Sequence, residues 1–293
     1  MRRVAAALLL AAGGGCLAAC PPAGESRASL QALKAAEWKE PADAARRQAL
    51  ALALADCLSD PDPVLRDAIA FDGLQNWMRT GRLDDTTVAT LRQRLLAVLA
   101  APPDAAGFAQ PFAALVLAEV ARIDRLRGGL SDGDRAALVA QGAAWLSGWR
   151  DMRAFDEKDG WRHGVAHGAD LMLQLALNPR LTRAQADVLL GAVGSQVMPA
   201  GAHAWHHGEP DRLAAPVFYL ARGSLLEPAD WERWLTALAM KRQRTPVSAA
   251  TLAQKHNLSL FLNSLYVAVR EAGSAELQAR LLPGLKKALR EAE

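Results

Sequence analysis

The chain has 293 residues, of which 51% are hydrophobic and 5% aromatic, and its 34 basic and 31 acidic residues leave a formal net charge of +3. This length is ample for burying a hydrophobic core, and the near balance of charge argues against a nucleic-acid partner, which requires a strongly basic surface. Isoleucine occurs only as Ile69 and Ile123, and tyrosine only as Tyr219 and Tyr266. Since strands favour such residues, the composition favours helices.

The first 20 residues have the features of an export signal. "MRR" is followed by the apolar, small-residue stretch "VAAALLLAAGGGCLAAC", which is too short for a transmembrane helix of roughly 20 apolar residues. Its last four residues, "LAAC", resemble the lipobox of bacterial lipoproteins. The resemblance implies that residues 1–19 are a signal peptide and that Cys20 becomes the lipidated first residue. The alternative is an ordinary signal peptide with an incidental cysteine.

These features predict an exported protein that is anchored to a membrane through an N-terminal lipid. The residue after Cys20 is Pro21 and not the aspartate associated with inner-membrane retention, so the outer membrane is favoured if the source is Gram-negative. Cys16 would leave with the signal and Cys20 would carry the lipid, which leaves Cys57 alone. We therefore expect no intrachain disulfide.

The remaining chain is expected to consist of a short tether, residues 20–29, and a single helical-repeat domain, residues 30–293. In "TTVATLRQRLLAVLA", apolar residues recur at three- and four-residue spacing, which is typical of an amphipathic helix. Thr182 with Gln185 forms a capping box at another helix start. Such signals predict helices near residues 42–58, 63–79, 86–100, 108–127, 131–150, 161–177, 182–198, 209–222, 228–242, 248–272 and 274–291.

The predicted helices fall into pairs. The first helices of five successive pairs begin near residues 42, 86, 131, 182 and 228, a spacing close to the roughly 40 to 47 residues of HEAT or armadillo repeats. We therefore expect an all-α fold, an α-solenoid of antiparallel HEAT-like or armadillo-like helix pairs. An irregular or toroidal helical bundle is the alternative.

Residues 160–170, "GWRHGVAHGAD", are the most distinctive segment of the chain. On a continuous helix, His167 would lie about 40° round the axis from His163, and Asp170 about 20° away on the other side, so all three share a face. Gly160, Gly164 and Gly168 each cost such a helix about 1 kcal/mol relative to alanine. Close packing against a neighbouring helix is the favoured explanation for this cost.

A second histidine-rich segment, "HHGEPDRLA" at residues 206–214, opens the second helix of the next pair. Second helices of successive pairs usually line the concave surface of a solenoid, so the two segments are expected to meet in one cleft. All six histidines fall between residues 163 and 256, which agrees with a single site. The predicted cleft residues are Trp161, His163, His167, Asp170, His207, Glu209, Arg212 and Asn257.

Two functions remain open for this cleft. The first is a binding module for a peptide, a glycan or a protein. The second is a metal-dependent hydrolase, in which His163, His167, Asp170 and His207 bind zinc or iron and Asp170 or Glu209 acts as the catalytic base. The spacing HGVAH lacks the glutamate of the zinc-protease motif, which favours binding. A simpler interpretation is a polar layer whose neutral imidazoles are hydrogen-bonded within the protein.

Four segments together resemble the bacterial family called domain of unknown function 2785: "LSDPDPVLRDAIAF", "GWRHGVAHGADLM", "HGEPDRLA" and "LFLNSLY". The resemblance covers about residues 50–270 and implies an all-helical fold, but it implies no reaction. Pro210 departs from the acidic residue expected there, and the lipoprotein signal is an addition to the domain. The most specific matches are Gly160, Trp161, His163, Ala166, His167, Gly168, Ala169, Asp170, His207, Gly208, Glu209, Arg212 and Leu213.

Overall fold

A computed structural model describes residues 20–293, and the predicted signal peptide, residues 1–19, lies outside the described residues. The described part is all-helical apart from one short β-hairpin, which confirms the all-α prediction. A 3₁₀ turn at Ala55–Ser59 and a π-helical segment at Val64–Phe71 precede α3. The helices are α1 (Arg27–Ala35), α2 (Ala44–Leu54), α3 (Asp72–Arg79), α4 (Asp85–Ala100), α5 (Ala109–Arg127), α6 (Asp132–Gly148), α7 (Gly164–Ala176), α8 (Arg183–Val197), α9 (Glu209–Arg222), α10 (Pro228–Met240), α11 (Ala249–Glu271) and α12 (Ala275–Ala292).

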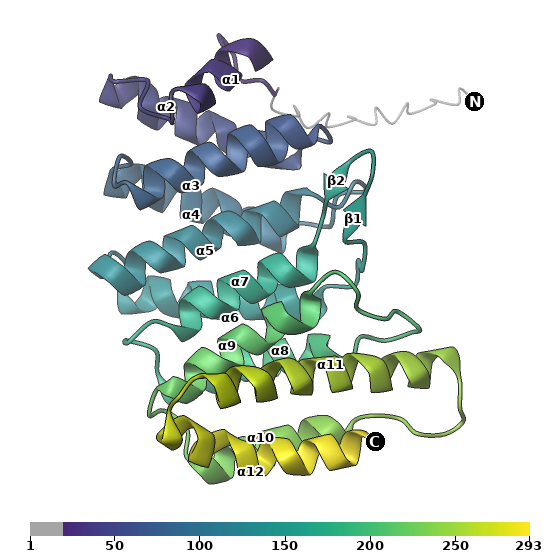
Figure 1. The fold of residues 1–293 in the computed structure, drawn as a ribbon. Coiled ribbons are helices and arrows are strands. Elements are labelled where there is room, and N and C mark those ends of the chain that lie inside the picture. Colours follow the sequence, from purple (N-terminus) through teal and green to yellow (C-terminus); the bar gives the residue numbers. More distant parts are fainter. Residues whose placement is uncertain (1–19) are drawn as a thin grey trace, which may run out of the picture.

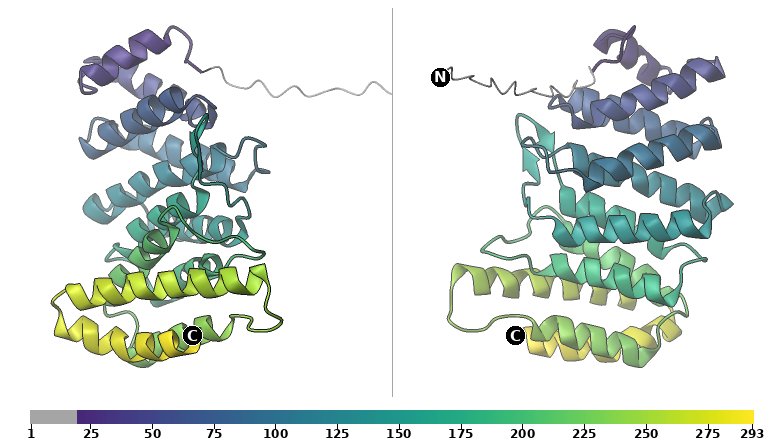
Figure 2. Two further views of the ribbon diagram at one scale, coloured as in Figure 1. Left: turned by 45° about the vertical axis from the view of Figure 1, so that its right-hand side comes forward. Right: turned by 180° about the vertical axis from the view of Figure 1, so that it is seen from behind.

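The helices are stacked in chain order and form two layers (Figures 1 and 2). One layer contains α3, α5, α7, α9 and α11, and each of these helices contacts the next. The other layer contains α2, α4, α6 and α8, again with contacts between successive members. Helices α10 and α12 pack on each other at the C-terminal end of the stack. The second helices of the predicted pairs therefore lie side by side, as a common site requires.

The N-terminal end differs from the sequence-based expectation. Residues 27–29, which we expected in the tether, already belong to α1, and Ser26 caps this helix by accepting a hydrogen bond from the backbone N–H of Ser29. Leu30 is fully buried, and its burial holds α1 against the stack. Cys20 and Cys57 form a disulfide, so the prediction of no intrachain disulfide is wrong. The pairing of Cys20 with Cys57, 37 residues further along the chain, depends on tertiary contacts that the cysteine spacing does not indicate.

The start of α7 also differs from the prediction. The structure places residues 155–161 in an antiparallel hairpin of β1 (Phe155–Asp156) and β2 (Gly160–Trp161), with Phe155 opposite Trp161. Helix α7 begins only at Gly164, and His163 precedes it with a left-handed backbone, φ = +50°. The helix does not begin at residue 161 because Gly160, with φ = +76°, belongs to the hairpin. His163 is thus the N-cap of α7: its carbonyl accepts a hydrogen bond from the backbone N–H of His167, and the centres of the two imidazole rings lie 6.0 Å apart, close together as the sequence predicted.

The glycines of α7 allow it to pack closely on α6. A Cβ atom on Gly168 would lie 2.6 Å from Cδ1 of Leu146, and one on Gly164 would overlap the indole of Trp149. The packing interpretation therefore accounts for these two glycines. None of the helices in residues 20–293 is both long and apolar enough to span a membrane.

Candidate ligand-binding site

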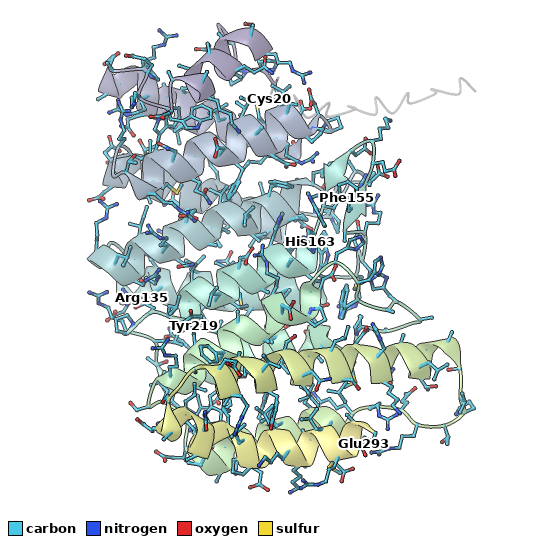
Figure 3. All side chains as sticks on the ribbon, viewed as in Figure 1. Cys20, Arg135, Phe155, His163, Tyr219 and Glu293 are labelled. Carbon is cyan, nitrogen blue, oxygen red and sulfur yellow. A yellow bond between two sulfur atoms is a disulfide. The ribbon has the colours of Figure 1, made fainter. Side chains whose placement is uncertain are left out.

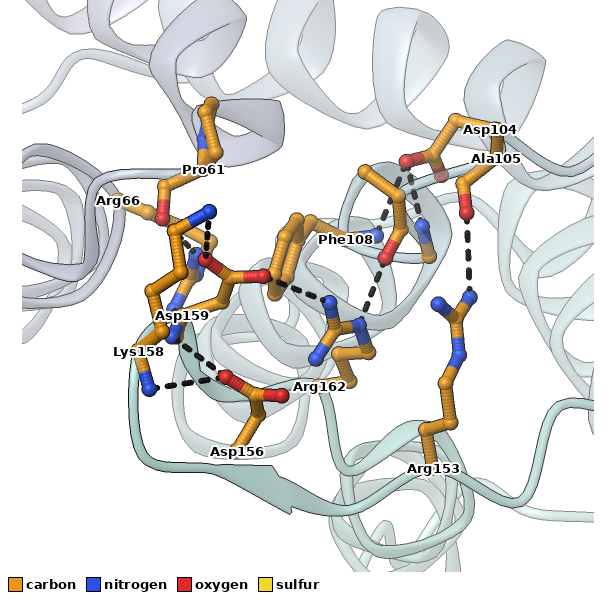
Figure 4. Close-up of polar contacts among 12 residues, drawn as sticks. Pro61, Arg66, Asp104, Ala105, Phe108, Arg153, Asp156, Lys158, Asp159 and Arg162 are labelled. Atoms are coloured by element: carbon orange, nitrogen blue, oxygen red, sulfur yellow. Dashed lines mark hydrogen bonds and ion pairs between the residues drawn. The ribbon is translucent and has the colours of Figure 1, made fainter.

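The hairpin is held against the stack by two arginines that contact Phe108 (Figure 4). The fully buried Arg66 lies 3.9 Å from the centre of the Phe108 ring and donates a 2.7 Å hydrogen bond to the carbonyl of Asp159. Arg162 lies 4.5 Å from the same ring centre and donates to the carbonyl of Ala106. Cation–π contacts are stronger when desolvated. The hairpin is therefore a fixed platform that presents Trp161.

The loop between α8 and α9 is held in place by Asn257 of α11. The side-chain amide of Asn257 donates to the carbonyl of His203, and its oxygen accepts a 2.8 Å hydrogen bond from the backbone N–H of Trp205. Asn257 and Trp205 are each 1% exposed. Asn257, predicted to face a ligand, is therefore a buried positioning residue, because its amide satisfies the backbone of this loop.

The hairpin and this loop together present a continuous set of aromatic rings. Trp161 stacks on His163 at 4.7 Å between ring centres and meets His207 edge-on at 5.6 Å. Phe155 lies 4.9 Å from Trp161 at the hairpin end. Trp161 and Phe155 are 39% and 48% exposed. We call this set the aromatic surface; its members are Phe155, Trp161, His163, His203, His206 and His207.

Glu209 is buried beneath the aromatic surface, at the first residue of α9. Its Oε2 accepts a 2.9 Å hydrogen bond from the backbone N–H of His207, and its Oε1 lies 3.4 Å from Nε2 of His163. The second distance is too long for a well-formed hydrogen bond. Burial opposes ionisation, but His163 and the backbone N–H groups of Glu209 and His207 outweigh it and lower the pKa of Glu209 to about 2. Glu209 therefore places a negative charge at the N-terminal end of α9.

His167 faces the interior of the stack. Its ring meets Phe112 edge-on at 5.0 Å, and the residue is 7% exposed. Burial, together with the positive charges of His163 and Arg212, lowers the pKa of His167 to about 3. The imidazole is neutral and packs on Phe112, but its buried Nδ1 has no hydrogen-bond partner in residues 20–293. The expected layer of histidines that are hydrogen-bonded within the protein is therefore not what the structure shows here.

Asp170 and Arg212 join α7 to α9. The Arg212 guanidinium donates a 2.9 Å hydrogen bond to the Asp170 carboxylate. The side chain of Asp170 is 19% exposed and that of Arg212 is 49% exposed. Burial raises the pKa of Asp170 to about 6, although the positive charge of Arg212 opposes this shift. The pair is thus a part-buried contact between the two helices.

The structure brings the two histidine-rich segments together. Asp170, Glu209 and Arg212 have hydrogen-bond partners within the protein, whereas Nε2 of His163 and Nδ1 of His167 are buried without a partner in residues 20–293. Trp161, His207 and Arg212 are the predicted residues with substantial exposure, whereas Asn257, His167 and Glu209 are buried. No group of three or more His, Cys, Asp or Glu side chains in residues 20–293 has the geometry of a metal site. The space between His163, Trp205 and Glu209 is too small for a water molecule.

Sequence reasoning missed Phe155 and the hairpin that presents it. Gly160 was the available signal, because three-residue hairpin loops, here residues 157–159, are typically followed by a glycine with a left-handed backbone. The strands were missed because each has only two residues, which is too short for an alternating pattern.

Known proteins place the chain in a family without assigning it a reaction. No curated protein and no solved structure matches it. The family described as protein of unknown function (DUF2785) matches residues 95–267, a segment that contains the hairpin and α5 to α9. Because this match covers more than half of the chain and includes both histidine-rich segments, the chain belongs to the DUF2785 family.

Proposed function

We propose that this protein is a binding module whose aromatic surface takes a protein segment that presents apolar side chains. The observation that carries the proposal is Trp161, which is 39% exposed and contacts rings from two other parts of the chain. Tryptophan and arginine are enriched among residues that dominate protein–protein binding energy. Arg212, 49% exposed, supplies a cationic group nearby.

A protein partner is favoured over a glycan because His163 covers one face of the Trp161 ring. A sugar stacks on an aromatic face, of which His163 leaves one on Trp161, whereas an apolar side chain packs against this face and also against the ring edges. The surface is also preformed, since Arg66 and Arg162 fix the hairpin. A rigid anchor loses little conformational entropy when a partner binds. The hydrolase alternative has no comparable support, because the metal ligands required for it are not grouped in residues 20–293.

Site-specific photo-crosslinking in the producing cell tests this proposal. A photoreactive amino acid replaces Trp161, and a matched variant carries it at Val188, which is 46% exposed on α8 in the other layer. We expect a protein adduct of discrete mass from position 161 and none from position 188. Adducts of equal yield at both positions, or none at either, would contradict the proposal. Adducts with cell-wall glycan alone would favour the glycan instead.

We also propose that the helix stack is an α-solenoid of the HEAT or armadillo type. Contacts between successive helices within each layer support this arrangement, and so does the spacing of the predicted pairs. A solenoid would explain why the hairpin and the loop before α9 lie close together, since both lead into neighbouring second helices. In small-angle X-ray scattering, the solenoid predicts an elongated monomer, and a ring-shaped profile would favour the toroidal bundle.

For the location, we propose export followed by lipid anchoring at Cys20. A disulfide between Cys20 and Cys57 is compatible with export, since such bonds persist outside the reducing cytoplasm. The lipid requires the same sulfur atom, however, so the anchored form would have a free Cys57 thiol. The disulfide and the lipid therefore exclude each other on one molecule.

Mass spectrometry of the N-terminal peptide from membranes distinguishes the two forms of Cys20. We expect an acylated Cys20 in the membrane fraction, and the Cys20→Ser variant should appear in the soluble fraction. A Cys57→Ser variant should remain on the membrane, because Cys57 takes no part in anchoring. Recovery of the Cys20–Cys57 disulfide peptide from all of the protein would exclude anchoring at this residue.

A further inference from the structure

Two pockets lie at the C-terminal end of α9, far from the aromatic surface. The first has a volume of about 520 Å³ and lies between the C-terminal ends of α7 and α9. The second, about 450 Å³, lies between α9 and the start of α12. Both volumes are within the range of about 300 to 1,000 Å³ typical of small-molecule sites. Tyr219 and Arg222 line both pockets.

Tyr219 and Arg222 are free to bind a ligand. Neither the Tyr219 hydroxyl nor the Arg222 guanidinium makes a hydrogen bond or an ion pair with another residue of the range 20–293. The guanidinium instead lies 5.8 Å and 6.0 Å from the ring centres of Tyr219 and Phe218. The neighbouring Arg280, by contrast, is occupied by the carbonyls of Ala221 and Gly223 and by Glu276.

The chemistry of the walls distinguishes the two pockets. Apolar residues line the α7–α9 pocket together with Tyr219 and Arg222, namely Leu177, Pro179, Leu181, Leu220 and Leu225. The pocket beside α12 contains the Glu276 carboxylate, which repels an anion. A guanidinium and a hydroxyl together match a carboxylate group. The α7–α9 pocket therefore combines an anion-binding rim with an apolar wall.

We propose that the α7–α9 pocket binds an organic carboxylate with an apolar body about the size of a dipeptide. The carboxylate accepts hydrogen bonds from Arg222 and the Tyr219 hydroxyl, and the apolar body packs against the leucines of the wall. A fatty acid and the C-terminal end of a peptide share this chemistry. Figure 3 shows Tyr219 below His163 and to its left, and the length of α9 separates the two sites by roughly 20 Å.

Isothermal titration calorimetry with the full chain tests the pocket. The probes are N-acetyl-leucyl-leucine, its C-terminal amide, and decanoate. We expect the wild-type protein to bind N-acetyl-leucyl-leucine or decanoate and to bind the amide at least tenfold more weakly. Arg222→Gln should weaken binding of the carboxylate probe about tenfold or more, and Tyr219→Phe should weaken it less, because the hydroxyl is neutral whereas the guanidinium also supplies a positive charge opposite the carboxylate.

Arg46→Gln is the matched control. Arg46 lies on α2 with its side chain 64% exposed, and its loss should leave the affinity unchanged. Binding of decanoate alone would identify a fatty carboxylate, and binding of the peptide alone would identify a peptide C-terminus. The proposal is overturned if neither carboxylate binds, if the amide binds equally well, or if Arg222→Gln binds as the wild type does while circular dichroism shows it folded.

Discussion

The two ends of α9 differ in whether their polar side chains have partners within the protein. At its N-terminal end, Glu209 is engaged by His163 and by backbone N–H groups, and the space beside it does not admit a water molecule. At its C-terminal end, Tyr219 and Arg222 are without partners in residues 20–293 and line a cavity of about 520 Å³. A segment rich in titratable residues therefore does not by itself create a cavity, and a segment with few such residues can line one.

The difference between the two ends follows from which backbone groups lack a hydrogen-bond partner within the helix. The first backbone N–H groups of a helix lack partners within it, and the buried Glu209 at the start of α9 supplies a negative charge for them. At the other end, Arg280 of α12 donates to the carbonyls of Ala221 and Gly223. Arg280 thus satisfies these carbonyls, and Arg222 lines the pocket without a hydrogen bond or an ion pair in residues 20–293.

The largest expected effect is the loss of the carboxylate at the N-terminal end. Glu209→Ala should lower the free energy of unfolding by about 2 to 3 kcal/mol at pH 7, because buried N–H groups lose a charged acceptor. Urea denaturation measures this change. Glu276→Ala at the other end is the control, since Glu276 is 82% exposed and its loss should cost less than about 0.5 kcal/mol.

The pH dependence of Glu209→Ala has a definite sign. The pKa of Glu209 is lowered to about 2 in the folded protein from its ordinary value of 4.5, so the ionised carboxylate stabilises the fold above pH 4.5. This contribution is lost as the pH falls toward 2. The difference between wild type and variant should therefore shrink in acid. A difference that stays constant from pH 7 to pH 3 would show that Glu209 acts through packing alone.

The close packing of α7 on α6 depends on the glycines of α7. Gly168→Ala should destabilise the protein by about 1 to 3 kcal/mol, because the new methyl group overlaps Leu146. Gly191→Ala on α8 is the matched control, since an added Cβ there has no neighbour within 4 Å. That substitution should stabilise the helix by up to about 1 kcal/mol. Thermal melting of both variants measures the two effects. If both substitutions raised the melting temperature, or both lowered it, close packing at Gly168 would be contradicted.

Much of this arrangement was predictable from local sequence signals. The capping box of Thr182 and Gln185 is present at the start of α8, and most helix bounds lie within a few residues of the prediction. The start of α7 was not predictable from periodicity, because Gly160 and His163 adopt left-handed backbone conformations that end one element and begin another. Such conformations depend on tertiary contacts, here those of Arg66 and Arg162 with the hairpin and Phe108.

The candidate site was predictable in its location but not in its chemistry. Histidine spacing indicated that the segments of His163 and His207 meet, and the pairing of helices indicated where. The burial of His167 against Phe112 and the pairing of Asp170 with Arg212 depend on residues from other helices. The pocket beside Tyr219 gave no motif at all, because a cavity is formed by the spacing of helix ends and not by any single segment.

A smaller effect is expected at the contact between α7 and α9. Burial raises the pKa of Asp170 to about 6, above its ordinary value of 3.8, so the folded protein binds this proton more tightly than the unfolded chain. Wild-type stability should therefore fall as the pH rises from about 4 through 6. Asp170→Asn cannot ionise and should gain about 1 kcal/mol relative to wild type over this range, because the lost Arg212 contact offsets part of the benefit. Urea denaturation at pH 4 and pH 7 would refute this if the variant gained nothing.

The smallest expected effect is at the C-terminal end of α9. Tyr219→Phe combined with Arg222→Gln should change the free energy of unfolding by less than about 0.5 kcal/mol, because neither side chain has a polar partner in residues 20–293 to lose. Chemical denaturation without any ligand measures this directly, and Glu209→Ala gives the contrast from the other end. A loss of 2 kcal/mol or more would mean that Tyr219 and Arg222 hold the fold together. In that case the two ends of α9 would not differ in kind, since both would use their polar groups to stabilise the helix stack.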